Sequence, residues 1–210
     1  MNVQAMNRLR QYLSTQFQPF DRAALWSSQV AKEGALIVFW WAVPSFLFVW
    51  LVSRFRDYLP AAYLESAISE GIGPHLWNVV GTLGLVLVGF ALLFPRSRLI
   101  ARSAYYVLIN TNAIGGLSFG LLFGQLFTRF AASTKNLALW KVWLMGAGGV
   151  CLAIQVLALN FSLWYLGHLM ATREASDGFL HRVERIDFPL RLFAFLFFGT
   201  FPVILLFMEK

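Results

Sequence analysis

Long apolar runs alternate with short charged segments along most of this chain. Five runs, each about 20 residues or longer, contain no Asp, Glu or Lys. Uncharged apolar runs of about 18 residues or more predict membrane-spanning helices. We therefore expect an all-α fold, a polytopic integral membrane helix bundle with a single transmembrane domain over 34–208. Its spans are predicted at about 34–53, 76–94, 103–128, 142–170 and 189–208.

Residues 1–33 are too polar to cross a bilayer. Apolar side chains recur there at helical spacing with arginines beside them, and they are Met6, Leu9, Leu13 and Phe17. This pattern predicts an amphipathic helix on the cytoplasmic surface of the membrane. The alternative is an ordinary solvated helix. A second short interfacial helix is expected at 61–74, where the chain is too charged to span.

The distribution of charge indicates an orientation. Charged residues make up 13% of the chain and hydrophobic ones 59%, whereas soluble domains carry about 25% charged residues. The segments 1–33, 95–102 and 171–188 hold ten Lys and Arg, against six in the segments on the other side of the predicted bilayer. The positive-inside rule then predicts a plasma (inner) membrane protein with a cytoplasmic N-terminus and an outside C-terminus. Flanking basic residues explain the net charge of +7, so no nucleic-acid partner is expected.

The predicted spans lack the groups that several chemistries require. None contains a carboxylate or lysine for a proton relay. Cys151 is the only cysteine, and the three histidines, His75, His168 and His181, form no ligand pattern. No nucleophile motif appears either. We therefore expect a non-enzymatic protein with no catalytic residue, cofactor or metal, and an intramembrane enzyme is the least favoured alternative.

Small residues line one face of the third predicted span. Gly116, Gly120 and Gly124 recur every fourth residue, and Gly149 and Ala153 repeat this spacing in the fourth span. Faces of this kind let helix backbones approach closely in lipid. We interpret these five residues as a helix-packing or oligomer face. Its partner is expected to be the second or fourth span of the same chain, or another copy.

Uncharged polar residues are concentrated in the same spans. The candidates for a polar lining are Asn78, Thr82, Asn110, Asn112, Gln155 and Asn160. The alternative is that these amides hydrogen-bond between helices. Asn110 and Asn112 lie about 200° apart on a helix, so they do not face the same neighbour. This concentration predicts that spans two, three and four form the inside of the bundle. Spans one and five are expected to face lipid, or bulky partner surfaces, over much of their circumference.

The sequence thus favours a component of a pore or permease, or an integral subunit of a membrane complex. The alternative is a structural or assembly subunit that conducts nothing. Expected partners are the lipid bilayer and other membrane subunits or further copies of this chain.

Overall fold

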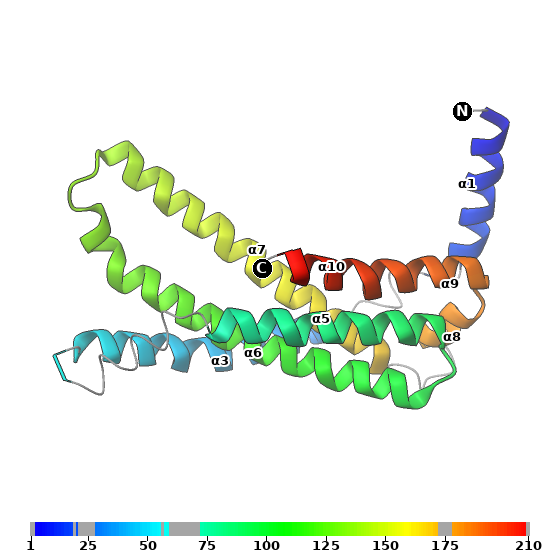
Figure 1. Cartoon of the computed structure of the whole chain (residues 1–210), viewed down its shortest axis with the longest axis horizontal. Helices are drawn as coiled ribbons and strands as arrows, with labels where there is room; N and C mark the ends of the chain where they lie inside the picture. Colours follow the sequence, from blue (N-terminus) through cyan, green and yellow to red (C-terminus); the bar gives the residue numbers. More distant parts are fainter. Residues whose placement is uncertain are drawn as a thin grey trace. The chain divides into compact units, whose positions relative to one another are not determined.

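The computed structural model describes residues 3–18, 20, 28–55, 57–58, 72–171 and 178–208, and no strand occurs among them. Figure 1 shows the helices in chain order. They are α1 (Val3–Phe17), α3 (Ser28–Arg54), α5 (Ile72–Leu93), α6 (Arg98–Thr134), α7 (Leu139–Ala171), α8 (Phe179–Glu184), α9 (Phe188–Phe195), the π-helix η2 (Leu196–Thr200) and α10 (Phe201–Met208).

Five helical stretches of the described chain are long and apolar enough to cross a membrane. They are α3, α5, α6, α7 and the continuous run from α9 through η2 to α10. The all-α fold and the five expected spans are confirmed, and the protein is a multi-pass membrane protein. The interfacial helix expected at 61–74 lies outside the described residues up to residue 71, and residues 72–74 already belong to α5.

Helices α6 and α7 are longer than the sequence pattern predicts. They contain 37 and 33 residues, which corresponds to about 55 Å and about 50 Å at 1.5 Å per residue. A hydrocarbon core is about 30 Å thick, so both helices tilt or extend beyond it. Arg102 and Arg129 bracket the uncharged part of α6.

Contacts within the chain divide it into two compact units. Unit 1 comprises Met1–Ala31, Thr82–Leu108 and Tyr165–Lys210, and unit 2 comprises Lys32–Gly81 and Ile109–Trp164. Helices α3, α5, α6 and α7 each contribute residues to both. The two units are described separately below.

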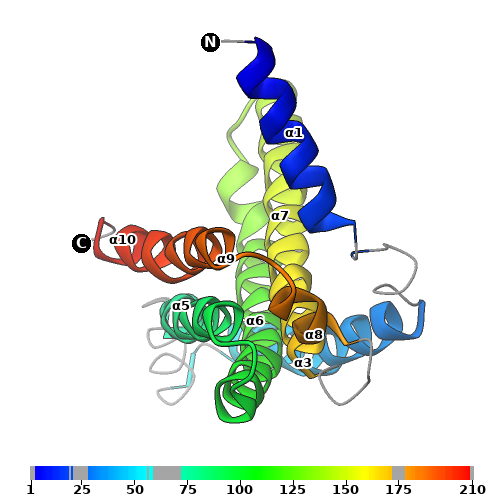
Figure 2. The same cartoon turned by 90° about the vertical axis from the view of Figure 1, so that its right-hand side faces the viewer.

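In unit 1, the α9–η2–α10 run lies beside the second half of α5 (Figures 1 and 2). The two backbones approach closely at Gly89, which has no side chain. A Cβ atom added to Gly89 would lie only 3.2 Å from the backbone N of Gly199 and from the carbonyl O of Phe195. Close to this crossing, the rings of Phe90 and Phe195 are 4.9 Å apart. The π-helical turn precedes Pro202, which has no N–H to donate to the preceding turn.

In unit 2, α3 packs against α6. Ala42 and Val49 of α3 are buried at 9% and 4% exposure, and both face glycines of α6. By contrast, no residue in the most apolar stretch of α7 is buried within the described chain, whereas Asn160 and Trp164, nearer its C-terminal end, are 1% and 2% exposed. The first span adds one packed face to the inside that was predicted from spans two, three and four, while its Trp40 is 73% exposed.

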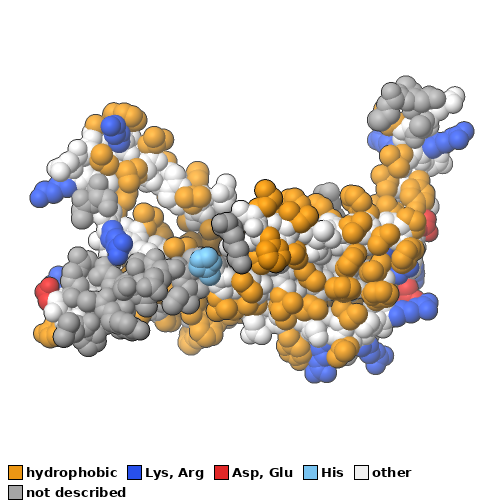
Figure 3. All heavy atoms as spheres, viewed as in Figure 1, with side chains coloured by type: hydrophobic (Ala, Val, Ile, Leu, Met, Phe, Trp, Pro, Cys, Tyr) orange, Lys and Arg blue, Asp and Glu red, His pale blue; other side chains and the backbone are white. Residues whose placement is uncertain are grey.

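The outer surface of the spans is strongly apolar. Hydrophobic side chains cover much of the face drawn in Figure 3. Leu36 of α3, Trp143 of α7 and Phe193 of α9 are each more than 60% exposed. Exposure on this scale suits helices that are surrounded by hydrocarbon.

Candidate functional site

Two asparagines from different helices meet in the middle of unit 2. Asn112 of α6 and Asn160 of α7 are 0% and 1% exposed. The Asn160 Nδ2 group donates to the Asn112 side-chain Oδ1 at 2.8 Å and to its backbone O at 3.1 Å. Both residues were predicted as polar lining, and the structure joins them to each other.

Two further helices complete this group of polar side chains. Trp77 of α5 donates its indole Nε1–H to Asn160 Oδ1 at 3.1 Å. Asn112 Nδ2 lies 3.5 Å from the carbonyl O of Gly34 in α3 and donates to it. We call Trp77, Asn112 and Asn160 the asparagine cluster. Through it, α3, α5, α6 and α7 are hydrogen-bonded within one unit, so its amides serve helix packing.

The sequence alone did not identify Trp77 or Gly115 as parts of this cluster. A Cβ on Gly115 would clash with Asn160 Oδ1 and lie 2.7 Å from Trp77 Nε1. Gly115 is therefore what allows the two side chains to approach α6. The available signal was its position one helical turn after Asn112, on the same helix face.

The glycine face of α6 packs against α3. A Cβ on Gly116 would lie 3.0 Å from the carbonyl O of Val38, and one on Gly120 would clash with the carbonyl O of Ala42. A Cβ on Gly124 would lie 2.8 Å from Val49 Cβ. The expected partner was the second span, the fourth span or another copy. The structure places the first span there.

The sequence signal for this partner lies on one face of the first span. The α3 residues that meet the glycines are Val38, Trp41, Ala42, Ser45 and Val49. Apart from Trp41 they are small or β-branched, and they recur every three or four residues, as one helix face requires. Trp41 meets Gly116 through its Cβ, at 3.2 Å from the position of an added Cβ. Average composition therefore misrepresented the face that packs.

The remaining candidate residues do not join the asparagine cluster. Asn78 and Thr82 are half-buried, while Asn110 and Gln155 are exposed. On α7, Gly149 and Ala153 are half-buried, and a Cβ on Gly149 would lie 3.2 Å from Leu126 Cδ2 of α6. The hydrogen bonds described for the asparagine cluster involve none of the other four candidate lining residues.

A different face of α7 is exposed and carries small or polar residues. The spacing of three and four residues places them together, and they are Gly148, Cys151, Gln155, Ala158 and Ser162. We call these residues the α7 face. A Cβ on Gly148 would have nothing within 4 Å. Within the described chain, the α7 face is available for a partner helix.

An apolar pocket of about 560 Å³ lies in unit 2. Its lining comes from α3, α6 and α7 and includes five phenylalanines, Phe39, Phe46, Phe119, Phe123 and Phe161. No charged side chain contributes to it. A pocket of this chemistry suits an apolar chain such as a lipid tail.

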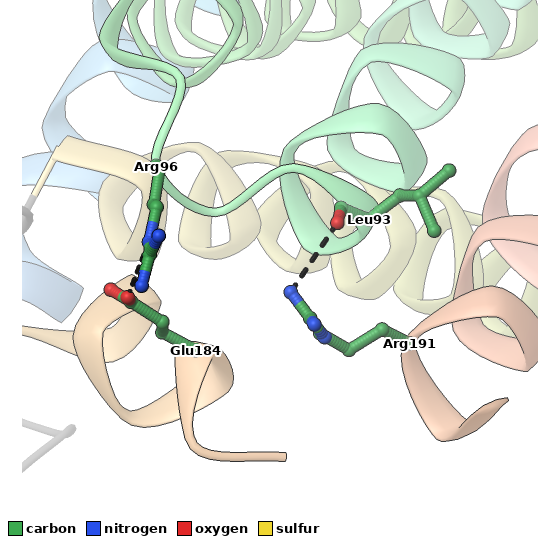
Figure 4. A network of polar contacts seen from close by, with 4 residues as sticks. All are labelled: Leu93, Arg96, Glu184 and Arg191. Carbon is green, nitrogen blue, oxygen red and sulfur yellow. Dashed lines mark hydrogen bonds and ion pairs between the residues drawn. The ribbon is translucent and has the colours of Figure 1, made fainter. Parts of the chain in front are cut away.

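Unit 1 contains a smaller pocket with two arginines, which we call the arginine pocket. Its volume is about 400 Å³, and its lining residues are Leu93, Phe94, Pro95, Arg96, Glu184, Phe188 and Arg191. Figure 4 shows Arg96 pointing toward Glu184 and Arg191 pointing toward the carbonyl of Leu93. The Arg96 Nε donates to Glu184 Oε1 at 2.6 Å, and Arg191 Nη1 donates to Leu93 O at 3.4 Å.

Within unit 1, helix α1 contacts the start of α9. The Tyr12 hydroxyl donates to Asp187 Oδ2 at 2.7 Å, and the backbone N–H of Asp187 donates to Gln16 Oε1 at 3.0 Å. The hydrogen bond to Asp187 raises the pKa of the Tyr12 phenol above its ordinary value of 10.0, and desolvation and the carboxylate charge act in the same direction. The donating hydroxyl is therefore protonated at neutral pH, and it stops donating as the pH rises through the raised pKa.

Metal-ligating side chains do not gather in the described part of the chain. No group of three or more His, Cys, Asp or Glu residues there has the geometry to hold a metal ion. His181 is exposed and contacts the guanidinium of Arg185 at 3.4 Å. Cys151 is a free, exposed cysteine. The polar features of the two units are thus the asparagine cluster, the α7 face and the arginine pocket.

Comparison of the chain with protein-family models, with curated proteins and with solved structures finds no match.

Proposed function

We propose that this protein is a non-enzymatic integral subunit of a membrane assembly, in which the α7 face packs against the same face of a second copy. Its N-terminus lies in the cytoplasm and the membrane is the plasma (inner) membrane, in accordance with the distribution of Lys and Arg. The role is structural: the chain supplies spans and helix contacts to the assembly, and it carries out no chemistry itself.

The exposed amide of Gln155 is the observation that carries the proposal. Gln155 lies midway along α7, among apolar residues, and is exposed within the described chain. An amide that faces hydrocarbon without a hydrogen-bond partner costs free energy, because no water is present to replace the lost bonds. A second α7 at this position would supply a partner amide.

The neighbours of Gln155 support a helix at the same face. Gly148 and Cys151 precede it and Ala158 follows it at helical spacing. Small residues let two backbones approach closely, which strengthens dispersion contacts and interhelical hydrogen bonds in lipid. In a two-fold symmetric pair, each residue near the axis meets its own counterpart.

The asparagine contacts favour packing over conduction for the two most buried candidate lining residues. Asn160 donates to Asn112 and accepts from Trp77 of α5, and Asn112 donates to the carbonyl of Gly34 in α3. Their polar groups are therefore engaged between helices. For this reason the proposal is a structural subunit, and the pore or permease alternative has no support from these contacts.

Oxidative cross-linking of Cys151 in native membranes tests the proposal. A disulfide forms only where the two Cα atoms come within about 7 Å, so a symmetric α7 pair gives a covalent dimer through Cys151. The matched control is the double variant Cys151→Ala/Val150→Cys, which moves the thiol by about 100° around α7 to another exposed position.

We expect a dimer band for the wild-type chain, little dimer for the control, and loss of the wild-type band on Ala158→Leu. The bulkier side chain of this variant separates the two helices. Equal dimer from both cysteine positions indicates random collision and contradicts the proposal. So does the absence of dimer from the wild-type chain.

A further inference from the structure

We propose that the arginine pocket of unit 1 binds the phosphate head group of an anionic membrane lipid. The pocket is distinct from the α7 face and from the asparagine cluster. It combines two guanidinium groups, one carboxylate and an apolar rim in a space of about 400 Å³. Basic pockets between membrane helices are suited to anionic lipid head groups.

Arg191 supplies the first argument. One of its terminal nitrogens, Nη1, donates to the carbonyl O of Leu93 at 3.4 Å, a long contact for a hydrogen bond. Its Nε is buried and has no hydrogen-bond partner among the described residues. A guanidinium carries five N–H donors in a fixed fork that matches phosphate oxygens. Arg191 therefore has donor capacity that the surrounding chain leaves unused.

The charge of the pocket supplies the second argument. Arg96 and Arg191 line the pocket together with Glu184. The two arginines and the one carboxylate therefore give the pocket a net positive formal charge. Glu184 neutralises Arg96 through a 2.6 Å ion pair, and this carboxylate would repel a bound anion. The Arg96 side chain is 85% exposed, so its guanidinium is accessible to a ligand at the pocket.

The position of the pocket in the sequence selects a lipid over a free anion. The pocket is formed where the second span ends and the fifth begins, and these two ends lie on the same side of a bilayer crossed by five spans. Phe94 and Phe188 line the same pocket and are 50% and 55% exposed. A free phosphate ion bound at the arginines would leave these two rings in contact with water. A lipid places its phosphate against the arginines and its apolar part against the rings.

Native mass spectrometry of the full chain in detergent tests this proposal. The lipid probe is dioleoyl phosphatidylglycerol, with dioleoyl phosphatidylcholine as the zwitterionic comparison and inorganic phosphate as a competitor. We expect preferential binding of phosphatidylglycerol, weakened about tenfold by Arg191→Gln, since a charge-assisted hydrogen bond is lost. Arg98→Gln is the matched control, because it removes an exposed arginine that does not line the pocket.

A second variant changes the affinity in the opposite direction and does not depend on the stability of the first. Glu184→Gln removes the carboxylate, so binding of phosphatidylglycerol should strengthen about fivefold. Equal effects of Arg191→Gln and Arg98→Gln would indicate a general response to surface charge and would contradict lipid binding in the arginine pocket. Unchanged or weaker binding in Glu184→Gln would also overturn it. Displacement of the lipid by millimolar inorganic phosphate would identify free phosphate as the ligand and contradict the lipid assignment.

Discussion

At the scale of single residues, Asn160 connects three helices of unit 2, α5, α6 and α7. Its side-chain amide makes three hydrogen bonds to two other helices, and it is 1% exposed. In a bilayer, hydrophobic attraction between helices is weak because lipid tails are equally apolar. Directed contacts such as these therefore determine which helices become neighbours and in which rotational position.

Asn160→Leu should destabilise the protein without preventing its insertion into the membrane. Three interhelical hydrogen bonds at about 0.6 kcal/mol each amount to about 2 kcal/mol. The free energy of unfolding in mixed detergent measures the change. Ser162→Ala, compared in the detergent-solubilised monomer, is the control, since the Ser162 hydroxyl bonds only to Ala158 O of its own helix among the contacts described. An equal, small effect of both variants would show that the asparagine cluster does not hold the helices together.

At the scale of helices, the pairing of α3 with α6 depends on the absence of side chains. Three glycines of α6 face Val38, Ala42 and Val49 of α3, close enough that added methyl groups would meet backbone or Cβ atoms. Backbone atoms cannot move aside as the end of a flexible side chain can. The pair is therefore intolerant of added volume, whereas the α7 face has space in the isolated chain.

Two matched glycine variants test this difference. In Gly120→Ala, the new Cβ meets the carbonyl of Ala42 and lies 2.8 Å from Ser45 Cβ, so we expect a loss of about 1–3 kcal/mol from overpacking. In Gly148→Ala, nothing lies within 4 Å, and the free energy of unfolding of the detergent-solubilised monomer should change by less than about 1 kcal/mol. Thermal unfolding compares the two. Equal loss in both would mean that α3 does not lie against this face of α6.

At the scale of the whole molecule, the number of spans determines which segments share a side of the membrane. Five crossings by the candidate spans of the described residues would put α1 and the end of α10 on opposite sides. The proposed orientation would then put the turn between α6 and α7 on the side opposite α1. Its basic residues, Lys135 and Lys141, oppose the orientation that the other flanking residues favour, so this turn is the most informative place for a test.

Labelling with a membrane-impermeant maleimide in intact cells tests the proposed orientation. In a Cys151→Ala background, Asn136→Cys should be labelled from outside and Ser14→Cys only after the membrane is permeabilised. Both positions are exposed, so a difference in labelling reports the side of the membrane. The reverse pattern would mean that the N-terminus lies outside.

The sequence by itself determined the class of the protein and the approximate position of every span. Charge-free runs such as 76–94 are sufficient for this, because the cost of burying charge in hydrocarbon acts on each helix separately. The sequence also indicated that Asn110 and Asn112 face different directions, since helical geometry alone fixes that angle. In the structure, Asn110 is exposed and Asn112 is buried.

Only the tertiary structure decided which helix faces meet. The first span was expected to face lipid or bulky partner surfaces over much of its circumference, and the structure shows that its remaining face packs against α6, with Ala42 directly against Gly120. Trp77 joined the asparagine cluster although no local pattern linked it to Asn160, 83 residues away. The arginine pocket likewise draws Arg96, Glu184 and Arg191 from three separate segments. Each of these contacts depends on the rotation and crossing of several helices at once, and a pattern read along one helix marks a packing face without specifying which helix it meets.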